Sequence, residues 1–130
     1  MNLRDIFRWL LAAFFIAAGL NHFRDAGFYR AMMPAWLPWH EALIQVSGIA
    51  EILGGLGVLV PVARPIAGWG LIALLVAVFP ANLHLAFHPV DLPGLAVPGW
   101  ALWVRLPLQV LFIAWVWWLT LLPQRDETLD

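Results

Sequence analysis

Four long apolar stretches restrict this chain to few folds. Helices built on them would be roughly 27 to 36 Å long, at about 1.5 Å per residue, and the hydrocarbon core of a bilayer is about 30 Å thick. Each stretch is therefore predicted to be a membrane-spanning helix. The predicted fold class is all-α, an integral membrane four-transmembrane-helix bundle forming one domain over residues 1–130, with an acidic, frayed tail at 124–130. The predicted spans cover residues 6–23, 42–60, 64–87 and 101–122.

The composition supports a membrane location. Hydrophobic residues make up 63% of the chain and charged residues 12%, against about 45–50% and about 25% in soluble domains. A chain of 130 residues is too small to bury so much apolar surface in one core, so the lipid bilayer is its first expected partner. A net charge of −1 without charge runs argues against nucleic-acid binding. The absence of cysteine excludes disulfides, thiol catalysis and cysteine-ligated metals.

The connections between the stretches predict two helical hairpins. A short turn at 61–63 joins the second and third stretches, whereas the loops at 24–41 and 88–100 are long and lie on the opposite side. A faint repeat pairs the segment 39–46 with 103–110, as expected for two related hairpins. The positive-inside rule places both termini in the cytoplasm of a cell (inner) membrane protein. This predicted orientation rests on four arginines on the terminal side (Arg4, Arg8, Arg64, Arg125) against two in the long loops (Arg24, Arg30).

Polar residues inside the spans mark where chemistry is expected, because lipid rejects them. By residue count they fall between the outer rim and mid-membrane, while the opposite end is almost purely apolar. We therefore predict one polar pocket in the outer half of the bilayer, formed by all four spans. The candidate ligand-binding or proton-relay residues are Glu51, Arg105, Gln109, His84, Asn82, Asn21, His22, Gln45 and Glu41.

Glu51 carries the most weight among these candidates, because a charge near mid-bilayer needs a partner or a proton. It shares a helix face with Glu41 and Gln45. Arg105, the one cation expected in a span interior, is the predicted partner of Glu51, and Glu41 is the rival partner of Arg105. Such a pair either fixes helix register or orients a ligand and exchanges protons.

Two further features of the third stretch bear on the site. Pro80 removes a backbone donor, which predicts a bend and an available carbonyl near Ala77 or Val76. His84 and His88 have the spacing of two metal ligands on one helix face. They lack the glutamate of a zincin motif, so no metal is predicted and these two histidines are only weak candidates.

Small residues four positions apart, such as Ala13 with Ala17 and Ala50 with Gly54, predict close helix approach. These seams serve either packing within the chain or a homo-oligomer.

Four motifs in the spans give the chain a family resemblance over nearly its whole length. It resembles the DoxX-like family of small four-helix membrane proteins, part of the redox-associated MauE/DoxX group. The motifs are Gly19-Leu20-Asn21-His22-Phe23, the run from Ser47 to Gly57 followed by Pro61, Phe79-Pro80-Ala81-Asn82 and Arg105-Leu106-Pro107-Leu108-Gln109. The family takes its name from a subunit of an archaeal thiosulfate:quinone oxidoreductase, so the resemblance implies a redox-associated subunit and a membrane or redox protein partner. With no cysteine in this chain, any thiol chemistry would belong to a partner or an external substrate.

Three functions remain open from the sequence. The first is a redox-associated subunit or a lipophilic-ligand binding protein, with a quinone as the cofactor that the resemblance suggests. The second is a non-enzymatic partner that assembles with or stabilises another membrane protein. The third is a carrier of small solutes or protons, which the apolar inner half disfavours. The residues do not assign a reaction, a substrate or a catalytic group.

Overall fold

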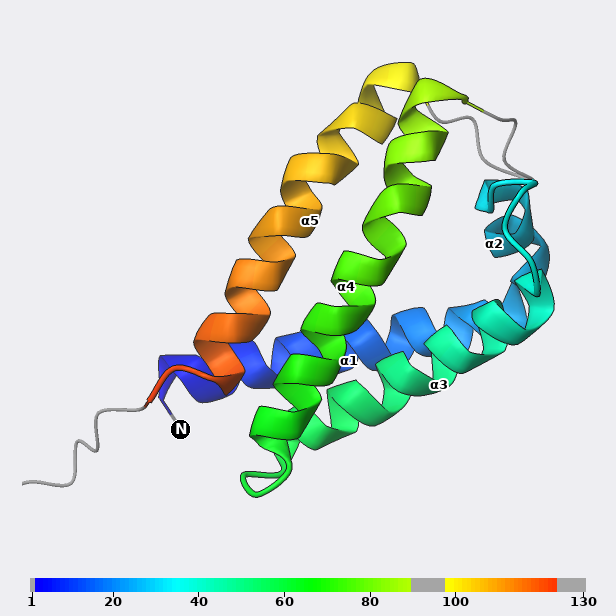
Figure 1. The fold of residues 1–130 in the computed structure, drawn as a ribbon. Helices are drawn as coiled ribbons and strands as arrows, with labels where there is room; N and C mark the ends of the chain where they lie inside the picture. Colours follow the sequence, from blue (N-terminus) through cyan, green and yellow to red (C-terminus); the bar gives the residue numbers. More distant parts are fainter. Residues whose placement is uncertain (1, 90–97, 124–130) are drawn as a thin grey trace, which may run out of the picture.

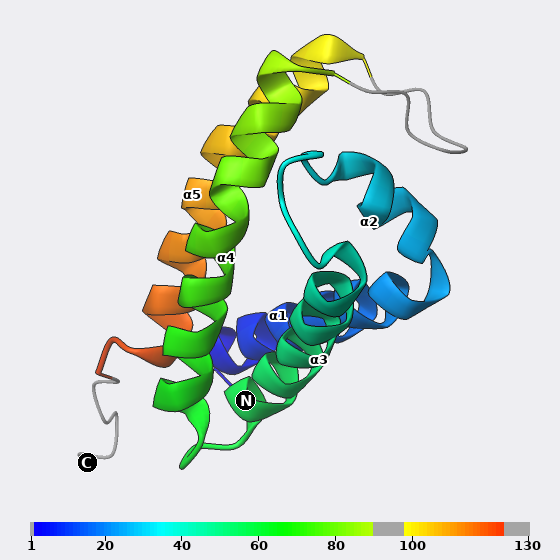
Figure 2. The same ribbon diagram turned by 45° about the vertical axis from the view of Figure 1, so that its right-hand side comes forward.

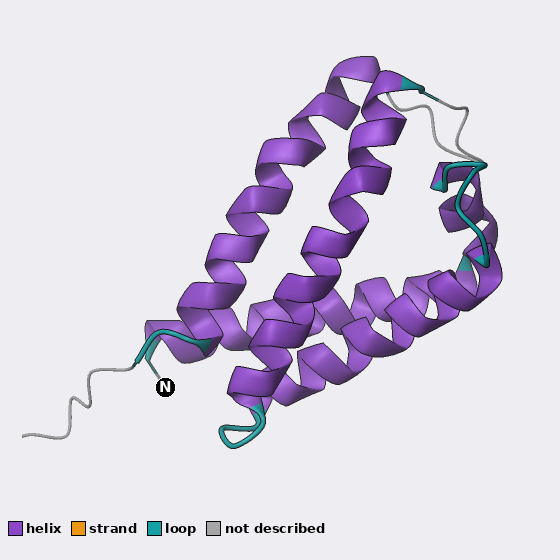
Figure 3. Cartoon of the chain, viewed as in Figure 1, coloured by secondary structure: helices purple, strands orange, loops and turns teal. Residues whose placement is uncertain are grey.

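The protein is all-α in the computed structural model, which describes residues 2–89 and 98–123 (Figures 1 and 3). Four helices are long and apolar enough to cross a membrane, which confirms the predicted fold class. Each begins and ends within three residues of its predicted stretch. The predicted frayed tail at 124–130 lies outside the described residues. The helices are α1 (Leu3–Arg24), α2 (Ala26–Met32), α3 (His40–Leu59), α4 (Arg64–Phe87) and α5 (Gly99–Thr120).

Local sequence explains where several helices begin. The Asn2 side chain caps α1 by accepting a hydrogen bond from the backbone N–H of Asp5 at 2.9 Å. Pro65 lies in the first turn of α4, where its missing N–H is not needed. Before α3, Trp39 adopts a left-handed conformation with φ 57°. The short helix α2 occupies a segment that the sequence presented only as a loop.

The four long helices form two hairpins that come together in a shared core at one end. In one hairpin α1 packs along α3, and in the other α4 packs along α5. Figure 1 and the turned view in Figure 2 show the hairpins diverging from the end that holds the chain's N-terminus toward the end that holds α2. We call these the core end and the α2 end.

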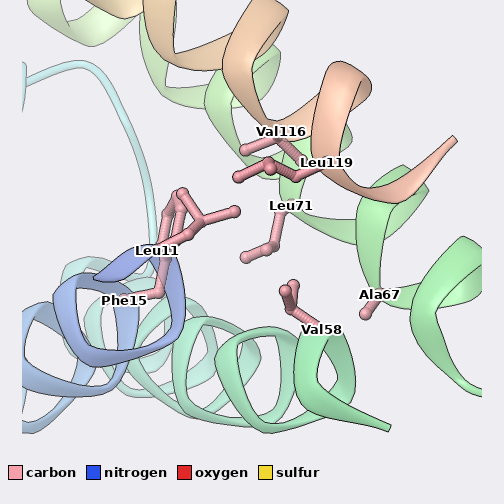
Figure 4. Close-up of a cluster of buried hydrophobic side chains, with 7 residues drawn as sticks. All are labelled: Leu11, Phe15, Val58, Ala67, Leu71, Val116 and Leu119. Atoms are coloured by element: carbon pink, nitrogen blue, oxygen red, sulfur yellow. The ribbon is translucent and has the colours of Figure 1, made fainter. Parts of the chain in front are cut away.

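The shared hydrophobic core lies at the core end, where all four long helices contribute buried side chains (Figure 4). Leu11 and Phe15 of α1 meet Val58 of α3 there, and all three are at most 1% exposed. The other members are Ala67 and Leu71 of α4 and Val116 and Leu119 of α5. Burying a side chain of this size stabilises the fold by about 1.5–3 kcal/mol in water. In lipid the same contacts act mainly through close packing.

Glycines set the close approach of α1 and α3 farther along the first hairpin. A Cβ atom at Gly19 would lie 2.5 Å from the carbonyl oxygen of Gly48, and one at Gly48 would lie 2.9 Å from the Cβ of His22. The helices therefore touch backbone to backbone at this level. This contact uses different small residues from the predicted seams, and it brings His22 of α1 against the polar face of α3.

At the α2 end the hairpins are joined by smaller contacts. Met32 of α2 packs against a second buried cluster formed by Leu85, Ala86 and Leu102 of α4 and α5. Trp36, after α2, makes an edge contact with the ring of His84, with ring centroids 6.3 Å apart. The segment from α2 to α3 thus connects the two hairpins where their long helices diverge.

Candidate functional site

The centre of the candidate site is an imidazole–carboxylate pair between α1 and α3. His22 Nε2 lies 3.0 Å from Glu51 Oε2, and the two side chains are 11% and 16% exposed. The glycine contact between α1 and α3 places the histidine at this depth, and the absence of a Cβ at Gly48 leaves room for it. Within the described residues Glu51 Oε2 is buried, and apart from this ion-pair contact with the imidazole it forms no hydrogen bond.

The other ring nitrogen of His22 faces acceptor oxygens. Nδ1 lies 3.0 Å from the carbonyl oxygen of Ile44 and 3.1 Å from the Ser47 hydroxyl, which donates its own proton to the same carbonyl at 3.1 Å. Both oxygens can accept from an N–H group, so these contacts favour the tautomer with a proton on Nδ1. The 3.0 Å approach of Nε2 to Oε2 is then attractive only with a proton between the two atoms.

Tyr29 of α2 covers this pair from the α2 end. Its ring lies against the ring of His22 with centroids 4.0 Å apart, and its hydroxyl accepts a hydrogen bond from Asn21 Nδ2 at 3.0 Å. Burial raises the pKa of Tyr29 above its usual value of 10.0, and the negative charges of Glu51 and Asp25 add to this effect. The positive charge of Arg105 and the Asn21 hydrogen bond act in the opposite direction. Sequence reasoning missed Tyr29 because it lies outside the apolar stretches.

The sequence predicted that Arg105 pairs with Glu51, and this prediction is wrong. Within residues 2–89 and 98–123 Arg105 forms no ion pair with a carboxylate, and its recorded hydrogen-bond contact is with Met32 Sδ at 3.7 Å. Residue counting does not give the direction in which the side chain of Arg105 points. Because the hairpins diverge, the guanidinium of Arg105 lies near α2 and interacts electrostatically with Tyr29, while Glu51 faces α1. The half-buried Arg105 is thus left with a thioether, a weak acceptor.

The rival carboxylate Glu41 is also not a partner of Arg105. It forms an exposed ion pair with Arg30 of α2, the two side chains being 58% and 48% exposed. Gln45 is exposed as well. The buried face of α3 runs through Ile44, Gly48 and Gly55, and Gln45 lies about 100° around the helix from Ile44. The prediction of one polar face on α3 is therefore wrong for Glu41 and Gln45, which are exposed. Glu51 is the largely buried carboxylate of that face.

The second hairpin has its own polar contact. Asn82 Nδ2 of α4 donates to Gln109 Oε1 of α5 at 2.7 Å, and Gln109 Nε2 donates to the carbonyl of Leu75. Gln109 is 6% exposed. The carbonyl that accepts from Gln109 is that of Leu75, whereas the sequence predicted an available carbonyl near Ala77 or Val76. Both amides are occupied by neighbours, so this contact holds α4 and α5 together.

The two histidines of α4 lie apart from these contacts. The rings of His84 and His88 stack with centroids 4.5 Å apart, and His84 also meets Trp36. In the described ranges, no group of three or more potential metal-ligating side chains comes together. The structure therefore brings Asn21, His22, Glu51 and Tyr29 into one cluster, with Arg105 at its edge. We call these five residues the α2-end polar cluster.

The core end is not purely apolar, contrary to the sequence expectation. Arg8 is only 3% exposed inside α1, so Arg105 is not the one cation within a span. Arg8 Nε donates to the carbonyl of Leu119 at 2.9 Å, and its Nη1 lies 3.0 Å from Asp5. Arg4 donates to the carbonyls of Trp118 and Leu122. The C-terminal carbonyls of α5 thus compensate the burial of these arginines.

A protein-family model described as "Domain of unknown function (DUF8561)" matches residues 11–120, so the chain belongs to this family. The match covers α3, α4 and α5 in full and α1 from residue 11 onward, and it includes both polar hairpin contacts. No curated protein and no solved structure matches the chain. The chain is therefore a small multi-pass membrane protein of this family, and the DoxX-like resemblance rests on its motifs alone.

Proposed function

We propose that this member of the DUF8561 family binds the polar head group of a lipophilic, quinone-like molecule at the α2-end polar cluster. The observation that carries the proposal is the state of Arg105. It is half-buried, and its recorded hydrogen-bond acceptor in the described part of the chain is the sulfur of Met32. An arginine has five N–H donors. A cation at membrane depth is stabilised by strong acceptors, so these donors favour a ligand with carbonyl or anionic oxygens.

The position of Arg105 fits such a ligand better than the other polar groups do. Asn82 and Gln109 are occupied by each other and by Leu75. Glu41 is engaged with Arg30 at the exposed surface. Arg105 instead contacts Met32 of α2, at the end where the two hairpins diverge (Figure 2).

The His22–Glu51 pair supplies the second part of the proposal. The proton between the two groups can be carried by either partner. The pair lies next to Tyr29, whose pKa depends on the charges of Glu51 and Arg105. A group of this kind can donate a proton to a bound oxygen or accept one from it. The redox-associated role implied by the DoxX-like resemblance is a narrower form of this proposal, in which a partner protein supplies the electrons.

The test is binding of decylubiquinone to the protein in lipid nanodiscs, followed by quenching of tryptophan fluorescence. We expect saturable quenching, and Arg105→Gln should weaken binding about 10- to 100-fold. This is the effect of losing a hydrogen bond to a charged donor, worth about 1.5–3 kcal/mol. Arg24→Gln is the matched control, because it removes the same charge from an exposed position on α1.

Two outcomes would contradict the proposal. One is quenching that rises linearly with quinone in all variants, as in empty nanodiscs. The other is equal affinity for the parent protein and Arg105→Gln. Co-purification of one membrane protein, unchanged by Arg105→Gln and by Glu51→Gln, together with either outcome, would favour the assembly-partner alternative.

A further inference from the structure

A second polar site lies at the core end, on the opposite side of the hydrophobic core from the α2-end polar cluster. It is a pocket of about 240 Å³ lined by Asp5, Arg8, Trp9, Leu59 and Arg64. Three helices contribute: α1 provides the first three residues, α3 provides Leu59 and α4 begins with Arg64. None of these residues belongs to the function proposed above.

The charges around this pocket are unbalanced among the described residues. Arg64 lies within the electrostatic influence of Arg8 and Arg4, which repel it, and of Asp5, which attracts it. Asp5 is already within 3.0 Å of Arg8. Two arginines, Arg8 and Arg64, thus line the pocket together with one carboxylate, and an anion in the pocket would reduce the repulsion between the two guanidinium groups.

The arginine side chains are held in place before any ligand binds. Arg64 Nε donates to the carbonyl of Val58 at 2.8 Å, and Arg8 Nε donates to that of Leu119. The two terminal nitrogens of Arg64 have no recorded hydrogen-bond partner in the described ranges and lie at a pocket that they help to line. A guanidinium fixed through Nε presents its remaining donors in a fork that matches phosphate oxygens.

The surroundings of the pocket are those of a membrane interface. Trp9 at its rim is 57% exposed, and tryptophan collects at the level of lipid head groups. Basic pockets between transmembrane helices are the usual sites for phosphorylated lipid head groups. The positive-inside expectation from the sequence would place this end toward the leaflet that carries acidic lipids.

We propose that the core-end pocket binds a phosphate group, with Arg64 as the main donor. An acidic lipid such as phosphatidylglycerol is the source that the bilayer places beside it, and a free phosphate ester is the soluble source of the same chemistry. Arg8 positions the site, Asp5 is the carboxylate that competes with the ligand for the arginines, and Arg64 contacts the ligand.

Native mass spectrometry of the full-length protein, extracted gently and given equal amounts of phosphatidylglycerol and phosphatidylcholine with identical acyl chains, tests the proposal. We expect at least a tenfold preference for phosphatidylglycerol. Arg64→Gln should abolish this preference, and Arg24→Gln at the α2 end should keep it. Asp5→Asn removes the competing carboxylate, so it should increase the preference and provides an independent test if Arg64→Gln fails to fold.

A separate arm adds inorganic phosphate at constant ionic strength to protein in phosphatidylcholine alone. A shift in thermal stability that depends on Arg64 in this arm, without lipid preference in the first, would assign the site to a soluble phosphate. Equal binding of the two lipids together with no effect of phosphate would overturn the proposal. A preference that survives Arg64→Gln, or one that Asp5→Asn lowers, would overturn it as well.

Discussion

His22 Nε2 and Glu51 Oε2 lie 3.0 Å apart across the contact between α1 and α3. The other ring nitrogen of His22 lies 3.0 Å from the carbonyl oxygen of Ile44, which only accepts hydrogen bonds and so favours the tautomer protonated at Nδ1. Substitution of either member of the pair leaves the other buried without its partner.

This pairing predicts the outcome of two double-mutant cycles. Glu51→Ala and His22→Ala should show a coupling energy of about 0.5–3 kcal/mol, as residues in contact do. Glu51→Ala with Arg105→Ala should show less than about 0.5 kcal/mol, because no ion pair joins these residues. Unfolding in mixed micelles measures both cycles. A larger coupling to Arg105 than to His22 would restore the pairing first expected from the sequence.

Tyr29, the single tyrosine of the chain, reports the charges of the α2-end polar cluster. Its pKa is raised by burial, by Glu51 and by Asp25, and is lowered by Arg105. Absorbance of tyrosinate should therefore give a midpoint above pH 10.0. Glu51→Gln removes a negative charge and should lower this midpoint, whereas Arg105→Gln removes a positive charge and should raise it. The control Arg24→Gln should leave it unchanged; equal midpoints in all variants would show that neither charge lies near Tyr29.

The glycine contact between α1 and α3 predicts a strong dependence on side-chain size. Gly19→Ala would place a Cβ 2.5 Å from the carbonyl oxygen of Gly48, so it should destabilise the protein by about 1–3 kcal/mol. Gly70→Ala in α4 is the matched control, since a Cβ there would meet nothing within 4 Å. That variant should be neutral or more stable by up to about 1 kcal/mol. Comparable losses in both variants, measured by unfolding in micelles, would argue against the observed helix contact.

The two glutamines of the sequence repeat should respond differently to the same change. Gln109→Leu removes the donor to Leu75 and the acceptor for Asn82, so it should cost about 1–3 kcal/mol. Gln45→Leu should change stability by less than about 0.5 kcal/mol, because Gln45 is exposed. Adding Asn82→Leu to Gln109→Leu should cost less than Asn82→Leu alone, since its partner is already gone. The same unfolding assay compares these variants, and equal losses for the two glutamines would contradict the structure.

Hydropathy and residue spacing were enough to predict the four long helices and their hairpin order. Lipid imposes this part of the fold directly, because a backbone in hydrocarbon must satisfy its own hydrogen bonds. Residue counts also grouped Asn21, His22 and Glu51 among the candidate site residues. All three lie in the α2-end polar cluster, together with Tyr29, which the counts did not include.

The partners of the charged residues did not follow from the same reasoning. A residue count fixes the position of a side chain along its helix but not the helix to which it points. Gly19 and Gly48 turn Glu51 toward His22, and the divergence of the hairpins leaves Arg105 near Met32. The environment of Arg8 was missed for a related reason. The carbonyl that accepts from it belongs to Leu119, which is 111 positions away in the chain.

Because the core shared by all four long helices lies at one end, a small tilt there is amplified along each hairpin. The helix α4 ends at Phe87, about 24 Å along the axis from Leu71. A tilt of about 5° where Leu71 meets Leu11 and Val116 would shift that far end by about 2 Å. Small repacking of a few aliphatic side chains would thus be magnified into a change in how far Arg105 stands from Tyr29 and Met32, and bilayer thickness or lateral pressure can act on the same hinge.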